Sequence, residues 1–130
     1  MDYSKVILDS SALIALISQE EGCEKVYSVV AHSIMSSVNV SEVAKFLIDR
    51  HKLSKESTIN SIQTLISEVI PFDEGHAYSS AELITKTKTI GLSLGDRACV
   101  ALGLETGYPI YTADRVWLKL DLNCKINLIR

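Results

Sequence analysis

Four acidic residues lie at positions where the chain changes from one kind of pattern to another. Asp9 follows a short β-branched run, and Asp114 follows another apolar run near the C-terminus. Glu42 and Asp96 each stand in the expected first turn of an amphipathic helical pattern. Two like charges about 4 Å apart cost roughly 4 kcal/mol at an effective dielectric constant of ~20. If these acids converge, they therefore need protonation or a bound cation.

Carboxylate oxygens without histidine or cysteine partners favour Mg²⁺ or Mn²⁺ over zinc. A Mg²⁺ ion held by a few carboxylates keeps several waters and also binds phosphate oxygens of a substrate. Water activated by such an ion can attack a phosphodiester bond, and one or two ions can stabilise the attacking and leaving oxygens. The chemistry that the acids favour together is therefore hydrolysis of a nucleic acid.

Each acid also has an ordinary structural explanation. Asn39 and Glu42 have the spacing of a capping box, in which the two residues satisfy each other's backbone N–H groups at a helix start. Ser93 and Asp96 repeat that spacing. The other two acids can be turn or N-cap residues. Chemistry is therefore indicated by the four acids in combination and not by any one of them.

Short apolar runs alternate with helical patterns along the chain. The expected strands are Lys5–Asp9, Ser33–Ser37, Val69–Phe72, Pro109–Thr112 and Ile126–Ile129. The expected helices are Ser10–Ser18, Glu21–His32, Val38–Lys52, one from the Ser54 cap to about Ser67, one from the Asp73 cap to Lys88, and one from near Gly95 to Gly107. Because each crossover between parallel strands needs a helix, the pattern predicts an α/β fold, a three-layer α/β/α sandwich with a mainly parallel sheet. Functional groups of such sheets gather beyond the carboxyl ends of the strands.

The composition is typical of one compact domain, which we expect to span residues 1–130. The net charge of −3 gives no overall basic field for nucleic acid, so any phosphate contacts must be local. Arg97 and Arg115 directly follow two of the acids and are candidates for contacting a phosphate or a partner. The three cysteines lack CxxC spacing, and no run resembles a secretory signal or a membrane span. We therefore expect a soluble cytoplasmic protein with reduced thiols and no membrane contact.

Four segments together resemble the PIN-domain family, most closely the VapC-type toxins of bacterial toxin–antitoxin pairs. They are VILDSSALIAL near the N-terminus, SSVNVSEV, LSLGDRACVALG and PIYTAD, in that order along the chain. In that family the matching acids bind Mg²⁺ or Mn²⁺ and cleave RNA endonucleolytically. The resemblance therefore implies that Asp9, Glu42, Asp96 and Asp114 are the metal-binding and catalytic residues. Whether one or two ions bind stays open, because Val116 and Trp117 occupy the region where some relatives carry a further acid.

The resemblance also implies supporting roles and partners. Ser11 and Thr112 match hydroxyl positions that the family uses to orient carboxylates or water held by the metal. Asn39 stands where the family often has Thr or Ser, in the same supporting role. From the residues alone, Ser10 and Ser11 precede a helical pattern and are interpreted as caps and not as a nucleophile. The family further implies a homodimer and a VapB-type antitoxin whose C-terminal segment covers the active-site groove.

Two other functions remain open from the residues alone. A phosphoacceptor signalling domain is also an α/β protein of about this length, and Asp73 at the end of the third expected strand could accept the phosphoryl group. Such a domain expects paired acids after the first strand, whereas Asp9 is followed by two serines. A catalytically silent PIN-like interaction module is the second alternative.

Overall fold

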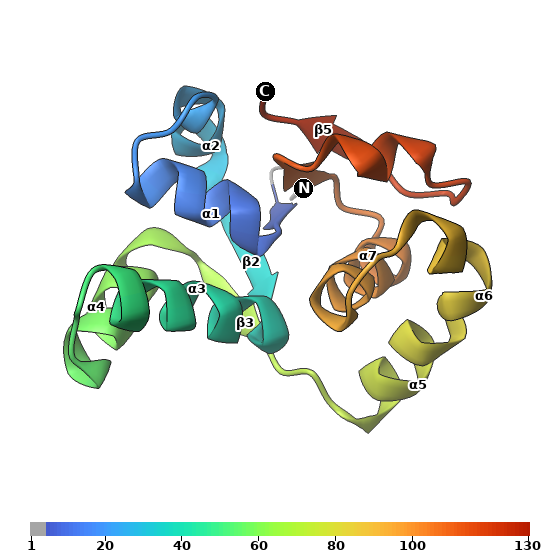
Figure 1. Ribbon diagram of the computed structural model, residues 1–130, viewed down its shortest axis with the longest axis horizontal. Coiled ribbons are helices and arrows are strands. Elements are labelled where there is room, and N and C mark those ends of the chain that lie inside the picture. The colour runs from blue at the N-terminus through green and yellow to red at the C-terminus, as the bar shows by residue number, and fades with distance from the viewer. Residues whose placement is uncertain (1–4) are drawn as a thin grey trace.

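A computed structural model describes residues 5–130 and contains a parallel β-sheet with helices on both faces (Figure 1). Within the described residues the strands are β1 Val6–Leu8, β2 Ser33–Ser36, β3 Glu68–Ile70, β4 Ile110–Thr112 and β5 Ile126–Leu128. Their order in the sheet is β3-β2-β1-β4-β5, and every neighbouring pair is parallel. The expected fold class and strand direction are confirmed.

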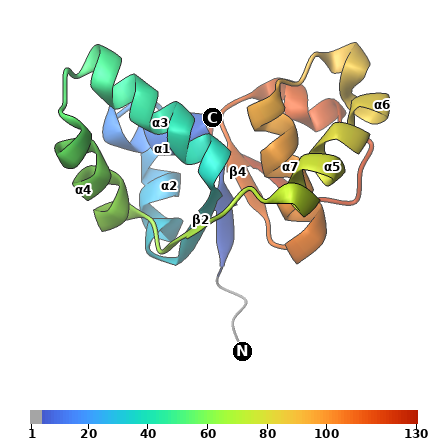
Figure 2. The same cartoon turned by 90° about the horizontal axis from the view of Figure 1, so that it is seen from below.

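The helices form two outer layers. They are α1 Ser10–Ile17, α2 Cys23–Val29, α3 Ser37–Arg50, α4 Lys55–Leu65, α5 Glu74–Glu82, α6 Ile84–Thr87 and α7 Leu94–Thr106. Short 3₁₀ helices occur at Val30–His32, Lys88–Ile90 and Arg115–Lys119. Helices α1 to α4 cover one face of the sheet and α5 to α7 cover the other, as Figure 1 and Figure 2 show from two directions.

The alternation of side chains along β1 divides the core between these layers. Val6 and Leu8 pack into the cluster formed with α1 to α4, whereas Ile7 packs into the cluster formed with α7. Neighbouring β2 repeats the division, because Ile34 joins the α7 side and Met35 the opposite side. All five side chains are buried, as expected for central strands of a sheet covered on both faces.

Three helices differ from the sequence-based expectation. The helix expected from Glu21 begins at Cys23, because Gly22 takes a left-handed conformation with φ of 90°, and its last turn is 3₁₀. The helix expected from Val38 begins at Ser37, because the side chain of Ser36 caps it. A helix expected to run unbroken to Lys88 is divided into α5, α6 and a 3₁₀ turn.

The division after α5 has a local cause. The segment from 84 to 90 is rich in β-branched residues, which lose side-chain freedom in a helix. The hydroxyl groups of Thr85 and Thr87 donate to the carbonyls of Glu82 and Leu83, and such bonds compete with regular helical hydrogen bonding.

Within the described residues, no helix is long and apolar enough to cross a membrane.

Candidate active site

Asp9 lies between β1 and α1, directly after the carboxyl end of the central strand of the sheet. It is the N-cap of α1, and its Oδ1 accepts hydrogen bonds from the backbone N–H of Ala12 at 3.0 Å and from Ser11 Oγ at 2.7 Å. Its Oδ2 accepts from Thr112 Oγ1 at 2.8 Å. The residue is only 3% exposed, and this burial raises the pKa of its carboxyl group to about 6 despite these hydrogen bonds.

Glu42 is held by side chains from two directions. Its Oε1 accepts from Ser10 Oγ at 2.8 Å and from Asn39 Nδ2 at 2.9 Å. The expected capping box of Asn39 and Glu42 is wrong, because Ser36 is the N-cap and both residues lie inside α3. Asn39 instead uses its amide to fix the carboxylate of Glu42 one turn further along the helix.

The same amide connects α3 to α7. Nδ2 of Asn39 also donates to the backbone carbonyl of Gly95, at 3.1 Å. A Cβ atom placed on Gly95 would lie 2.7 Å from Cδ of Glu42, too close for any ordinary contact. Because glycine has no side chain, the Glu42 carboxylate can occupy that space and reach the N-terminus of α7. Glu42 is therefore brought next to Asp96 across the interface of two helices.

Asp96 forms the expected capping box with Ser93. The Ser93 N–H donates to Asp96 Oδ2 at 3.0 Å, and the Asp96 N–H donates to Ser93 Oγ at 3.2 Å. Burial raises the pKa of Asp96 above its ordinary value, and the charges of Glu42 and Asp114 raise it further. The capping role is confirmed, but it leaves Oδ1 without a hydrogen-bond donor among the described residues.

Asp114 follows β4 and caps the 3₁₀ helix Arg115–Lys119. Its Oδ1 accepts from the Val116 N–H at 3.1 Å, and its own N–H donates to Thr112 Oγ1 at 3.0 Å. Thr112 thereby joins Asp114 to Asp9, since its hydroxyl donates to one residue and accepts from the other. This shared hydroxyl connects the acids that follow β1 and β4 at the end of the sheet formed by the carboxyl ends of these strands.

Electrostatics show that the four acids share one region. Burial first raises the pKa of Asp9, and the charge of Asp96 adds to this effect. The buried Cys99 thiol has a pKa well above its ordinary value, first because of burial and then because of Asp9, Asp96 and Glu42. Within residues 5–130, no lysine, arginine or histidine forms an ion pair with any of the four acids. Their mutual repulsion is therefore not relieved by a direct ion pair within the described residues.

The donor set suits a hard divalent cation. Glu42 Oε2, Asp96 Oδ1 and Asp114 Oδ2 accept no hydrogen bond from any described residue. Oxygen donors of this kind, without histidine or cysteine, match the preference of Mg²⁺ and Mn²⁺. Among residues 5–130 no three of these side chains are already grouped closely enough to hold one ion. The residue types and charges fit, and the side chains would have to turn inward to ligate together.

The two candidate arginines are engaged elsewhere. Arg97 Nε donates to the Ser80 carbonyl at 3.2 Å, and its Nη1 donates to the Leu92 carbonyl at 2.9 Å. These bonds connect α7 to α5 and to the loop before α7. Arg115 Nη1 donates to the carbonyl of Arg130 at 3.2 Å. The expected phosphate or partner contacts of both arginines stay predictions, and for Arg97 they would compete with packing bonds.

The sequence did not indicate the roles of two supporting residues. The expected capping role of Ser10 is wrong, because Asp9 is the N-cap of α1 and the Ser10 hydroxyl instead donates to Glu42, 32 residues away. Gly95 was expected only to mark a helix start, yet its missing side chain makes room for the same carboxylate. The single sequence signal for both is that each directly neighbours a candidate acid, Asp9 or Asp96.

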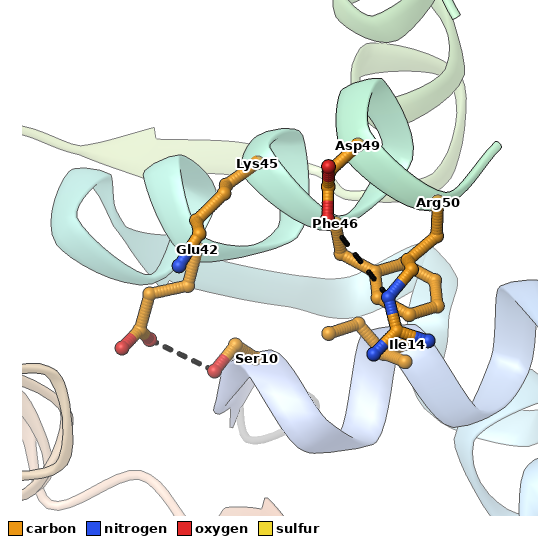
Figure 3. A pocket seen from close by; sticks show the side chains of 7 residues that line it. All are labelled: Ser10, Ile14, Glu42, Lys45, Phe46, Asp49 and Arg50. Carbon is orange, nitrogen blue, oxygen red and sulfur yellow. Dashed lines mark hydrogen bonds and ion pairs between the residues drawn. The ribbon is translucent and has the colours of Figure 1, made fainter. Parts of the chain in front are cut away.

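A groove runs along the interface of α1 and α3 from Glu42 (Figure 3). Its volume is about 360 Å³. Its lining residues are Ser10, Ile14, Glu42, Lys45, Phe46, Asp49 and Arg50. Ser10 and Glu42 thus line the groove and also form part of the acidic site.

Comparison with known families decides the classification. A model of the PIN domain matches residues 6–122, which include all four acids. The chain belongs to the PIN-domain family. This PIN domain has no significant match among curated protein sequences.

Solved structures with the same fold include toxin–antitoxin proteins. A toxin–antitoxin complex from Klebsiella pneumoniae has a TM-score of 0.75 and 16% identity, covering 96% of this chain and 98% of that one. A DNA-bound VapBC from Salmonella typhimurium has a TM-score of 0.73 and 16% identity, covering 97% and 98%. VapC20 from Mycobacterium tuberculosis, a toxin that cleaves the sarcin–ricin loop, has a TM-score of 0.70 and 14% identity, covering 85% and 90%. At these identities the likeness establishes the fold.

Proposed function

We propose that this PIN domain is a metal-dependent endoribonuclease and the toxin of a toxin–antitoxin pair. The observation that carries the proposal is that Asp9, Glu42, Asp96 and Asp114 lie in one region beyond the carboxyl ends of the strands, with no direct ion pair to a cationic side chain within residues 5–130. Membership of the PIN family and the fold shared with VapC-type toxins support the same activity.

The four acids would hold Mg²⁺ or Mn²⁺. Such an ion, when bound, supplies activation of water for attack on a phosphodiester bond and neutralisation of phosphate charge. Ser11 and Thr112 fix the Asp9 carboxylate by hydrogen bonds to different oxygens. Ser10 and Asn39 fix one oxygen of Glu42 and leave the other oxygen without a hydrogen bond from a described residue. The chain thus fixes the carboxylates of Asp9 and Glu42 before any ligand arrives, which lowers part of the cost of assembling the site.

The proposed partners follow from the relatives. RNA is the proposed substrate, in keeping with the cleaving activity named for VapC20. A VapB-type antitoxin is the proposed inhibitor, since the solved structures with this fold include VapBC complexes. A homodimer in the cytoplasm completes the proposal.

The direct test is cleavage of a mixed pool of single-stranded RNA by the purified protein. Cleavage is expected with Mg²⁺ or Mn²⁺, is expected to stop on addition of EDTA, and should fall by at least about 100-fold in Asp96→Asn. Asp121→Asn provides the matched control, because Asp121 is an exposed acid outside the site. An Asp96→Asn protein that cleaves as fast as the wild type would refute the mechanism.

The two alternatives make different predictions. The phosphoacceptor interpretation gains no support from Asp73, which caps α5 by accepting from the His76 N–H at 2.9 Å and follows the edge strand β3. Incubation with acetyl phosphate and measurement of the intact mass should yield no adduct. A silent interaction module should not bind Mn²⁺ at a defined site, whereas the proposed nuclease should give a saturable calorimetric titration.

A further inference from the structure

The groove between α1 and α3 begins at the acidic site and changes character along its length. Its near end is formed by Ser10 and Glu42, which are joined by a hydrogen bond of 2.8 Å. Further along α3 it is lined by Lys45, Asp49 and Arg50, with Ile14 and Phe46 as apolar lining between the two helices (Figure 3). Two cations and one acid therefore follow the anionic end, and Lys45 is the first charge after Glu42.

Lys45 is the cation nearest to the site along α3. It follows Glu42 by three residues, a spacing that places both side chains on one side of a helix. Figure 3 shows its side chain running back along α3 toward Glu42. Lys45 is exposed and forms no ion pair or hydrogen bond with any residue in the described part of the chain. Its positive charge is available to a ligand.

Arg50 provides a second accessible cation at the far end of the groove. Its Nε lies 3.9 Å from Asp49 Oδ2, but both side chains are about 70% exposed, at 73% and 69%. An ion pair so exposed is weak and screened by salt, so a phosphate can replace the carboxylate as partner. Phe46 packs its ring against His51 at a centroid distance of 5.3 Å and still lines the groove with Ile14.

Electrostatic repulsion opposes the binding of RNA close to the acidic site. The chain has a net charge of −3, and four of its acids meet at the proposed cleavage site. The acids repel phosphates beside the cleaved bond. At physiological salt, charges more than roughly 8 Å apart are largely screened, so only cations close to these phosphates can counter that repulsion. Lys45 and Arg50 supply cations in a groove that shares Ser10 and Glu42 with the site.

We propose that the groove between α1 and α3 holds the RNA nucleotide next to the cleaved bond. Lys45 binds the phosphate adjacent to the scissile one, Arg50 contacts the next phosphate, and the apolar lining of Ile14 and Phe46 receives a base. The proposal rests on the proposed ribonuclease function and identifies where its substrate lies. Lys45 is a substrate-binding residue that sets affinity, whereas the acids carry out the reaction.

The test is binding of a fluorescein-labelled 12-nucleotide single-stranded RNA of mixed sequence, followed by anisotropy in EDTA at several salt concentrations. Lys45→Ala should weaken binding about 3- to 10-fold at low salt and lower the slope of log K against log salt by about 1. Lys45→Arg should retain the wild-type slope. Phe46→Leu should weaken binding without changing the slope, because stacking does not release counterions. Lys25→Ala, at an exposed lysine on α2, is the control and should bind as the wild type does.

Cleavage with Mn²⁺ separates this proposal from the function on which it rests. Lys45→Ala should raise KM and leave kcat near the wild-type value. If the wild type cleaves RNA while Lys45→Ala keeps both affinity and slope, the groove is not the RNA site and its mixed charges instead suit a protein segment. If the wild type neither binds nor cleaves RNA, the ribonuclease function and this proposal both fail.

Discussion

The side-chain amide of Asn39 bonds at once to the backbone carbonyl of Gly95, 56 residues away, and to Oε1 of Glu42 on its own helix. Asn39 is 1% exposed, so this pair of bonds lies in the interface between α3 and α7. Its remaining oxygen, Oδ1, is buried without a partner among the described residues. One amide therefore sets where the carboxylate from α3 stands relative to the start of α7.

Replacing Asn39 should loosen this connection. Asn39→Ala removes both hydrogen bonds and leaves the buried Gly95 carbonyl without its side-chain donor, which should cost about 1–3 kcal/mol of unfolding free energy. The cleavage rate should also fall, because the Glu42 carboxylate loses one of its two donors. Urea denaturation and single-turnover cleavage measure the two effects. The exposed Asn60, changed to Ala, should alter neither; equal behaviour of the two variants would contradict the positioning role.

A methyl group at position 95 tests the space that Glu42 occupies. Gly95→Ala places a Cβ against the Glu42 carboxylate and should displace it from Asp96, lowering cleavage with little loss of helix content. Gly75→Ala is the matched control inside α5, where the added Cβ would lie an ordinary 3.4 Å from Asp73 Oδ1. The free energy of unfolding of that control should rise by about 0.5–1 kcal/mol, because alanine favours a helix more than glycine does, and its cleavage activity should not change.

The raised pKa of Asp9 predicts how stability depends on pH without metal. Its carboxyl has a pKa of about 6 in the folded protein against an ordinary value of 3.8, first because of burial. The folded state therefore binds this proton more tightly than the unfolded state does. The resulting contribution is fully present below about pH 4 and is lost as pH rises through 6, up to about 3 kcal/mol for a shift of ~2 pKa units.

Asp9→Asn should remove that dependence. In EDTA, the variant should become more stable relative to the wild type between pH 4 and pH 7, as measured by urea denaturation across the range. Asp121→Asn should follow the wild-type curve. A difference between Asp9→Asn and the wild type that does not change with pH would show that Asp9 does not titrate in this window.

Metal binding should reverse the repulsion among the acids. Mn²⁺ should raise the melting temperature of the wild type at pH 7, by an amount corresponding to about 2.7 kcal/mol at 100 times the Kd. Asp96→Asn should lose most of this gain, because one ligand and one negative charge are removed together. Thermal denaturation with and without Mn²⁺ measures it, and an equal gain in both proteins would place the ion elsewhere.

The sequence by itself determined the elements and the edge of the sheet at which the acids gather. Alternation of apolar runs with helical patterns indicated a parallel α/β sheet, which the structure confirms. The caps at Ser54, Asp73 and Ser93 were also readable, since a cap depends on residues two or three positions away. Such features are local, so the residues that cause them are neighbours in the sequence.

Only the tertiary structure decided how the acids are held. The bonds of Glu42 to Ser10 and of Asn39 to Gly95 span 32 and 56 residues. Neither has a local pattern, because each depends on the distance at which two helices pack on the same sheet edge. The same packing turned Asn39 from an expected cap into a connection between α3 and α7. The chain's residue types specify an acidic site, and the close approach of α3 to the glycine of α7 gives that site its geometry.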